Sequence, residues 1–273
     1  MDFTSNFVSF DARRIASLVS EMERNGFAVL RDFLTPEQLV QGRTYVMQQV
    51  HQREREFFAI HGVEAMEGSL PGGLAASAAF RQLLAEVYRI GARAAASDEE
   101  RIFPVIRCLQ GKSGLKESHF YHFDASLVTA LVPLFIPSGD AHCGHLISFP
   151  NIRPVRRNVV VNIVEKGILH NRISQKLTAI AVQRLWLKPL TLKLVPGNAY
   201  LFWGYRSLHA NEQCNPHKLR ATALYHFGDP HRDSVLGRLV LGSNKRHAQL
   251  DHNGLRPVAP PVATLGDMDS GAA

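Results

Sequence analysis

The chain has 273 residues, a formal net charge of +7 and 45% hydrophobic residues. This hydrophobic content supports a buried core and excludes wholesale disorder. No apolar run is long enough to cross a bilayer, and the N-terminus lacks the charged start and apolar block of a secretory signal. We therefore expect a cytoplasmic protein with no membrane partner, folded as one large domain or two small ones.

The positive charge makes nucleic acid a partner to consider. The basic residues are scattered, however, with one modest cluster at residues 153–158, and the chain has neither a zinc-finger spacing nor an aromatic RNA-binding strand. We expect no nucleic-acid binding and interpret the charge as favouring an anionic small molecule. Cys108, Cys143 and Cys214 have no disulfide or zinc-ligand spacing, which favours reduced thiols.

The first hundred residues are predicted to be mainly helical. Residues 11–25 carry apolar side chains at helical spacing, and Asp11 is placed to cap their N-terminus. The next stretch, FAVLRDFL (27–34), has the composition of a strand. A second helix begins at the capping-box pattern of Thr35 and Gln38 and is expected to run to about residue 56.

Residues 60–73 are glycine-rich and read as irregular, and an alanine-rich helix is predicted over 74–95. From about residue 102 the pattern changes to short strands. RIFPVIRCLQ, a GKSG turn and LKESHFYHFD are predicted to form a hairpin. The later strand candidates are LVTALVPLF, HLISFP, NVVVNIV, LTLKLVP, AYLFW and LRATALYHF.

Many short strands behind a helical N-terminus indicate a β-sandwich or jelly roll with helices packed outside. We predict a single domain over 1–250, with a helical part at about 1–100 and a jelly-roll core at about 101–240. The tail over 251–273 is rich in proline, glycine and alanine and is expected to be flexible.

The hexapeptide YHFDAS (121–126) places a histidine and an aspartate two residues apart. In a strand, His122 and Asp124 would point to the same face, as a buried hydrogen-bonded pair or as part of a metal site. A metal site needs a third ligand from a distant strand, and His209 is the candidate because it follows a tight turn and an aromatic strand. Two histidines and one carboxylate are the ligand set of non-haem iron(II) oxygenases. The alternative is an ion pair at the strand end and a core histidine.

Arg220 lies eleven residues after His209, and Thr222 would share its face of one strand. An α-keto acid that chelates a metal holds its far carboxylate several ångströms away, where a fixed cation is needed. The planar guanidinium of arginine binds a carboxylate through two parallel hydrogen bonds, and a threonine hydroxyl adds another.

Three stretches carry a family resemblance. The first, GFAVLRDFLTPEQL (26–39), is similar to the N-terminal strand and helix of a known enzyme family. The second, GHLISFPNIRP (144–154), occupies the place where that family usually has a Gly-x-Leu…Pro-Gly-Ser-His stretch. The third, PGNAYLFWGYRSLHANEQCNPHKLR (196–220), resembles the family's Ala-Gly-Asp…Phe…His…Asn…Arg segment. Over about residues 26–229 the chain resembles the phytanoyl-CoA dioxygenase family of iron(II)/2-oxoglutarate-dependent oxygenases. Asn198 replaces the usual aspartate, PNIR replaces Pro-Gly-Ser-His, and residues 155–190 match no family pattern.

The resemblance implies a mainly β fold with flanking helices, the double-stranded β-helix (a cupin-like jelly roll). It implies iron(II) held by His122, Asp124 and His209, with 2-oxoglutarate anchored by Arg220 and Thr222. It also implies a dioxygenase that uses O₂ and oxidises, by default hydroxylates, an unactivated C–H of a small molecule, releasing succinate and CO₂. We expect a monomer or homodimer.

Four further residues are candidates for binding. Arg107 is either an exposed charge or a contact to the cosubstrate or substrate, and Asn162 is expected to line the barrel. Arg153 and Arg157 are either part of a solvated face or hold an anionic substrate group. Two other functions stay open: a non-catalytic jelly-roll binding protein, and a metal-dependent cupin enzyme that uses no keto acid.

Overall fold

The computed structural model describes residues 10–53, 56–139, 142–155 and 188–230. The chain divides into two compact units, Met1–Pro230 and His231–Ala273. The second unit lies outside the described residues, and so does the predicted tail. The domain limits expected from the sequence therefore stay a prediction.

The N-terminal helices follow the local sequence signals closely. The Asp11 side chain caps α1 (Ala12–Asn25), and the capping box of Thr35 and Gln38 opens α2 (Pro36–His51). Instead of one alanine-rich helix there are two, because Ser77 ends one helix and caps the next. The remaining helical elements of this part are η1 (Glu64–Met66), α3 (Leu70–Ala76) and α4 (Ala78–Ala92). No helix among the described residues is long and apolar enough to span a membrane.

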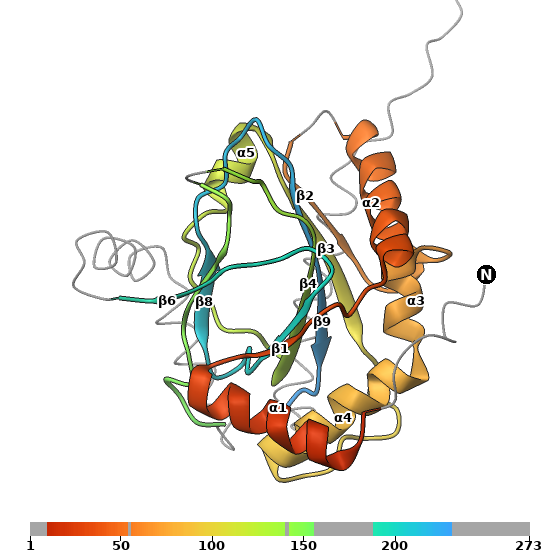
Figure 1. Cartoon of the computed structure of the whole chain (residues 1–273), viewed down its shortest axis with the longest axis vertical. Helices are drawn as coiled ribbons and strands as arrows, with labels where there is room; N and C mark the ends of the chain where they lie inside the picture. Colours follow the sequence, from red (N-terminus) through yellow and green to blue (C-terminus); the bar gives the residue numbers. More distant parts are fainter. Residues whose placement is uncertain (1–9, 54–55, 140–141, 156–187, 231–273) are drawn as a thin grey trace, which may run out of the picture. The chain divides into compact units, whose positions relative to one another are not determined.

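Six strands form one antiparallel sheet on which these helices pack (Figure 1). Its spatial order is β1-β7-β4-β9-β3-β2. The strands, in that order, are Ala28–Leu30, Ala199–Phe202, Val128–Phe135, Arg220–Phe227, Phe103–Leu109 and Phe58–His61.

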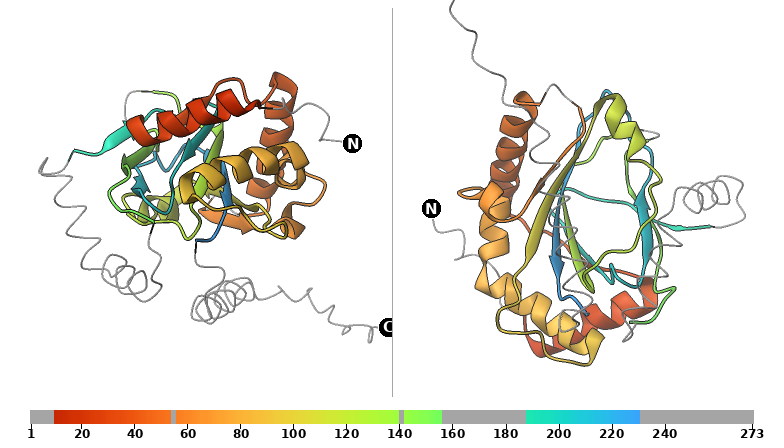
Figure 2. Two further views of the ribbon diagram at one scale, coloured as in Figure 1. Left: turned by 90° about the horizontal axis from the view of Figure 1, so that it is seen from below. Right: turned by 180° about the vertical axis from the view of Figure 1, so that it is seen from behind.

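A second, three-stranded sheet lies across from the first and is seen from two further sides in Figure 2. Its order is β6-β5-β8, with bounds Leu190–Leu192, Leu146–Phe149 and Leu208–Asn211. Two antiparallel sheets behind a helical layer are the mainly β, double-stranded β-helix architecture expected from the sequence.

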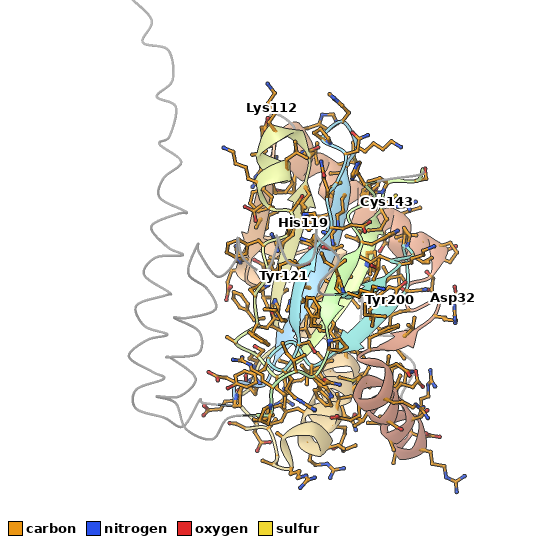
Figure 3. All side chains as sticks on the ribbon, turned by 90° about the vertical axis from the view of Figure 1, so that its left-hand side faces the viewer. Asp32, Lys112, His119, Tyr121, Cys143 and Tyr200 are labelled. Carbon is orange, nitrogen blue, oxygen red and sulfur yellow. The ribbon has the colours of Figure 1, made fainter. Side chains whose placement is uncertain are left out.

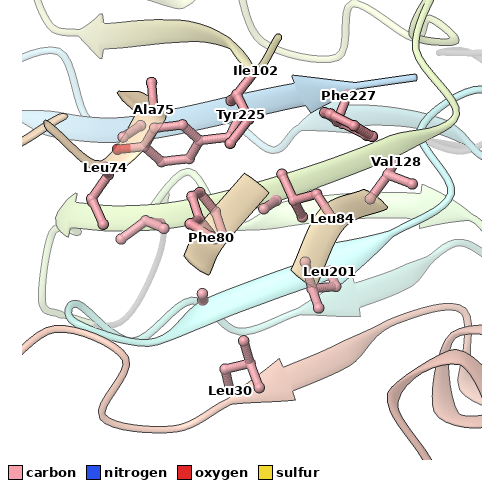
Figure 4. Close-up of a cluster of buried hydrophobic side chains, with 14 of the residues drawn as sticks. Leu30, Leu74, Ala75, Phe80, Leu84, Ile102, Val128, Leu201, Tyr225 and Phe227 are labelled. Atoms are coloured by element: carbon pink, nitrogen blue, oxygen red, sulfur yellow. The ribbon is translucent and has the colours of Figure 1, made fainter. Parts of the chain in front are cut away.

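The two faces of β9 (Arg220–Phe227) face different surroundings. Its odd-numbered residues from 221 to 227 belong to the main hydrophobic core, which the helices close from outside. Figure 4 shows this core, where Phe80 of α4 packs edge-on against Tyr225 with ring centroids 5.2 Å apart. Because side chains alternate along a strand, the even-numbered residues 220 to 226 face the second sheet. That inner face holds the polar residues discussed below.

The predicted hairpin over residues 101–124 is wrong. GKSGLK forms a short helix, α5 (Gly111–Lys116), and carries the chain from the first sheet to the second. The segment that follows pairs with β8 through isolated bridges, whereas β3 pairs with β2 and β9. The polar GKSG sequence is compatible with a turn or a short helix. In the structure the Glu56 carboxylate contacts this helix and accepts hydrogen bonds from the backbone and hydroxyl of Ser113.

Candidate metal centre

His122 and Asp124 lie where the chain leaves the second sheet and crosses to the first. His122 forms an antiparallel bridge with His209 of β8, through backbone hydrogen bonds of 2.9 and 3.0 Å. Two residues on, the Asp124 amide donates to the carbonyl of Gly204. His119 and Tyr121, labelled in Figure 3, belong to the same segment. The extended backbone directs the side chains of both predicted ligands to the inner face. The sequence predicted a full strand here, whereas His122 forms an isolated β-bridge.

The three predicted ligands meet around one point. Asp124 Oδ1 lies 3.6 Å from His122 Nε2 and 3.5 Å from His209 Nε2. One ligand atom from each residue lies within 4.8 Å of the others, and among the described residues no other set of three histidine, cysteine or acidic side chains does so. His119, three residues before His122, is not part of this group.

Both imidazoles are oriented by their second nitrogen. His122 Nδ1 lies 3.0 Å from the carbonyl of Phe120, and His209 Nδ1 lies 2.9 Å from the carbonyl of Ser207. A carbonyl oxygen can only accept, so each Nδ1 carries the proton in the neutral ring and each Nε2 keeps its lone pair. Both lone pairs are directed toward Asp124. This is how metal-binding histidines are held in proteins.

The electrostatics of the group suit a cation. Burial opposes ionisation of Asp124, but the charges of His209, His226 and His122 hold the pKa of its carboxyl well below the ordinary value. Burial, reinforced by the charge of His209, lowers the pKa of His122 to about 3. Burial acts against protonation of His209 too, yet the Asp124 carboxylate raises its pKa. The group therefore carries an ionised carboxylate and a neutral His122, which are the forms that bind metals.

The outer oxygen of Asp124 has partners that the sequence did not reveal. Thr129 Oγ1 donates a 2.5 Å hydrogen bond to Asp124 Oδ2, and His226 Nδ1 lies 3.7 Å from the same oxygen. Thr129 and His226 are direct cross-strand partners on β4 and β9, with Oγ1 and Nδ1 3.2 Å apart. Together the pair keeps Oδ1 turned toward the two histidines.

Gly204 makes room for this carboxylate. A Cβ atom built on it would overlap Asp124 Oδ2 and Thr129 Oγ1. The carboxylate thus rests directly against the backbone, whose carbonyl accepts from the Asp124 amide. Position 204 therefore requires glycine because the Asp124 carboxylate occupies the space that a Cβ atom would take.

Arg220 lies on the same inner face, farther along β9, and is 1% exposed. Its Nη2 donates to Asn211 Oδ1 at 2.8 Å and its Nε to the carbonyl of Gly144, while Thr222 Oγ1 lies 3.4 Å from Nη1. Burial, followed by the charge of Arg107, lowers its pKa to about 10. That value is still well above neutral pH, so the guanidinium is a buried cation with a fixed orientation.

A cavity of about 500 Å³ opens beside the ligand group. It contains Arg107, whose Nη2 lies 2.8 Å from Glu117 Oε2 and whose guanidinium stands 5.8 Å from the ring centre of Phe57. The full lining is Phe57, Ala59, His61, Phe103, Val105, Arg107, Glu117, His122, Asp124, Ala125, Ser126, Leu224 and His226. A larger cavity, of about 700 Å³, is lined by residues of α1, β1 and the start of α2 and includes none of the three ligands. The smaller one is therefore the candidate binding site.

The remaining predicted contacts lie elsewhere or outside the described residues. The Arg153 guanidinium is stacked between Phe123, at 3.9 Å from the ring centre, and Tyr205, at 4.0 Å. It is not part of the cavity lining, so its predicted contact with substrate gains no support from its position. Asn162 and Arg157 lie outside the described residues, as does most of the 155–190 segment.

Sequence reasoning missed Thr129, His226, Asn211 and Glu117. A threonine or histidine in a strand has no local mark that distinguishes a partner of a metal ligand from an ordinary inner residue. Asn211 had a usable signal, because it stands two residues after His209 and so had to share its face of the strand.

Neither a protein-family model nor a curated protein sequence matches the chain. Solved structures do. A prolyl 4-hydroxylase from Phytophthora capsici is 12% identical with a TM-score of 0.51, and 85% of this chain aligns with 71% of that one. The non-haem, α-ketoglutarate-dependent epimerase SnoN of nogalamycin biosynthesis is 13% identical with a TM-score of 0.50, over 80% of this chain and 84% of that one. AviO1 from Streptomyces viridochromogenes Tue57 is also 13% identical with a TM-score of 0.50, over 81% and 97%. At this identity the likeness shows a shared double-stranded β-helix fold.

Proposed function

We propose that this protein is an iron(II)/2-oxoglutarate-dependent dioxygenase of the phytanoyl-CoA dioxygenase type. It oxidises, by default hydroxylates, an unactivated C–H of a small molecule. The carrying observation is that His122, Asp124 and His209 converge on the same inner face as the buried guanidinium of Arg220. The fold shared with SnoN, described as non-haem and α-ketoglutarate dependent, agrees with this proposal.

The donor set fits iron(II). The three side chains offer two imidazole nitrogens and one carboxylate oxygen from one inner face. Zinc enzymes also use such sets, but non-haem iron(II) oxygenases are the characteristic users of two histidines and one carboxylate. Here His122, Asp124 Oδ1 and His209 would hold the ion, and Thr129 and His226 would orient the carboxylate.

The position of Arg220 fits an α-keto acid cosubstrate. Asn211, which accepts its hydrogen bond, is two residues from His209 on the same face of β8, and two residues of a strand span about 7 Å. A five-carbon diacid that binds the metal through one end brings its far carboxylate about that distance away. Nη1 and Nη2 each have two hydrogens, so the guanidinium can serve its present acceptors and still bind that carboxylate, with Thr222 beside it.

When bound, iron(II) and 2-oxoglutarate would supply the oxidation by O₂, with release of succinate and CO₂. The chain has the tasks of binding and exclusion. The three ligands would hold the metal, Arg220 would bind the cosubstrate, and the burial of Arg220 and Thr222 would limit the access of water there.

The cavity indicates a small substrate with an apolar body. Its volume of about 500 Å³ is in the range of small-molecule sites, and Phe57, Phe103 and Leu224 supply apolar walls. Arg107 offers a cation there but is paired with Glu117. An anionic group on the substrate, bound by Arg107 in competition with Glu117, is the finer part of the proposal. The monomeric or homodimeric state and the cytoplasmic location are proposed with it.

One experiment separates the three candidate functions. Purified protein is titrated anaerobically with iron(II) and then with 2-oxoglutarate, and the visible absorption is recorded before O₂ is admitted and succinate is measured. We expect a weak charge-transfer band only when both are present, followed by succinate release. His209→Ala should show neither, whereas a variant of the exposed His217, His217→Ala, should show both.

The alternatives give other results. A folded protein that retains no iron(II) would be a non-catalytic jelly roll, and the proposal would be wrong. A protein that binds iron(II) but gives no band or succinate with 2-oxoglutarate would be a cupin enzyme of another type.

A further inference from the structure

Cys143 and Cys214, far apart in the sequence, are direct partners across an antiparallel bridge. The backbone hydrogen bonds lie on either side of them, from Gly144 to the Gln213 carbonyl at 3.1 Å and from Asn215 to the His142 carbonyl at 2.9 Å. They therefore form a non-hydrogen-bonded pair, in which Cα atoms are about 4.5 Å apart and side chains approach closest. That separation is within the range that a disulfide spans, about 4.4 to 6.8 Å.

The two thiols also share one environment. Burial raises the pKa of the Cys214 thiol, the charge of Arg220 lowers it, and the nearby Cys143 thiol raises it further. Cys143, labelled in Figure 3, is 8% exposed and Cys214 is 3% exposed. Cys143 is therefore the more accessible of the two, and Cys214 is its cross-strand partner.

The third cysteine is placed differently. Cys108 lies on β3 and belongs to the core between the first sheet and the helices, with no exposed surface. Burial raises the pKa of its thiol to about 12. Cys108 thus serves as an internal reference thiol in the same chain.

We propose that Cys143 and Cys214 are a redox pair that forms an intramolecular disulfide under a two-electron oxidant such as hydrogen peroxide. The Cys143 thiol is oxidised to a sulfenic acid and peroxide is reduced to water. The Cys214 thiol then attacks the sulfenic sulfur, the S–S bond forms and a second water leaves. Two thiols supply the two electrons, and a dithiol reductant reverses the step.

The bond would tie together the segments around Arg220. The backbone carbonyl of Gly144, the residue after Cys143, accepts a hydrogen bond from Arg220 Nε. A Cβ atom built on Gly144 would meet both Arg220 Cδ and Cys214 Cβ, so the three residues are closely packed.

In the reduced form the Cys143 thiol donates to the Gly139 carbonyl at 3.4 Å and the Cys214 thiol to the Asn215 carbonyl at 3.8 Å, so forming the disulfide requires the two side chains to turn toward each other. The bond would then cross-link this region. The inference does not depend on the proposed oxygenase activity, since bond formation is measured on the protein without metal or cosubstrate.

Peptide mapping tests the pairing directly. Reduced full-length protein is treated with hydrogen peroxide, free thiols are blocked with N-ethylmaleimide, and the chain is denatured and digested. Trypsin places the three cysteines in separate peptides, residues 108–112, 117–156 and 207–218. We expect the second and third peptides joined, two hydrogens lighter than their sum, and Cys108 recovered as a thiol. Recovery of both Cys143 and Cys214 as thiols or as sulfinic acids, or a bond to Cys108, would overturn the proposal.

Thermal unfolding gives a second measurement. A cross-link over some seventy residues should raise the melting temperature by roughly 5 to 10 °C, and dithiothreitol should remove the rise. Cys143→Ser should show no rise, while Cys108→Ala should keep it. A dimer on a non-reducing gel in place of the intramolecular bond would contradict the inference.

Discussion

Arg220 donates a 2.8 Å hydrogen bond to Asn211, on the face of β8 that also carries His209. This hydrogen bond connects Arg220 on β9 with the strand that carries His209. His209 and Asn211 are two residues apart on β8, and two residues of a strand span about 7 Å. Arg220 can therefore be substituted without changing any of the three proposed metal ligands.

Arg220→Lys should separate cosubstrate binding from metal binding. Lysine keeps the charge but loses the planar fork, so the dissociation constant for 2-oxoglutarate should rise at least about 10-fold. The affinity for cobalt(II), used as a redox-stable probe, should stay within about 3-fold. Anaerobic calorimetry measures both. An unchanged 2-oxoglutarate affinity would count against the anchoring role.

Thr129→Val should weaken metal binding by removing a hydrogen bond to the proposed ligand Asp124. Valine has a similar shape but cannot donate to Asp124 Oδ2, and loss of such a partner typically costs about 10- to 100-fold in metal affinity. Thr129→Ser keeps the hydroxyl and should restore most of the affinity. Cobalt(II) titration of both variants measures the effect, and equal affinities would show that the hydroxyl has no orienting role.

Gly204→Ala should displace the ligand carboxylate by its new methyl group, which overlaps Asp124 Oδ2 and Thr129 Oγ1. We expect cobalt(II) affinity to fall by at least about 10-fold and the free energy of unfolding to drop by about 1 to 3 kcal/mol. Gly114→Ala is the matched control, because its Cβ would meet only ordinary or slightly tight contacts, the nearest at 3.3 Å. Full metal affinity in the Gly204 variant would contradict the crowding seen here.

Phe80→Ala should destabilise the fold itself. The ring is 2% exposed and packs on Tyr225 between α4 and the first sheet. Its truncation should lower the free energy of unfolding by about 3 to 5 kcal/mol in urea titration. Val40→Ala, at a 60% exposed position, should change that energy by less than about 0.5 kcal/mol. Similar values for both would show that α4 does not close the core.

Local signals in the sequence correctly predicted much of the helical part. Asp11, Thr35 and Gln38 act within one helical turn of their targets, so their caps can be read from spacing alone. The pairing of His122 with Asp124 is local in the same sense, because an extended backbone directs residues two apart to one side. The apolar stretches that became β4 and β9 were also recognisable.

The sequence by itself thus determined the capped helices, the apolar strands and the placement of Asp124 two residues after His122. Tertiary structure alone decided that GKSGLK crosses between sheets, that Thr129 and His226 meet Asp124, and that Cys143 stands opposite Cys214. These relationships join segments tens of residues apart, and they depend on the order and register of strands. Strand order follows from how all apolar faces are buried together, and no short stretch of sequence carries that information.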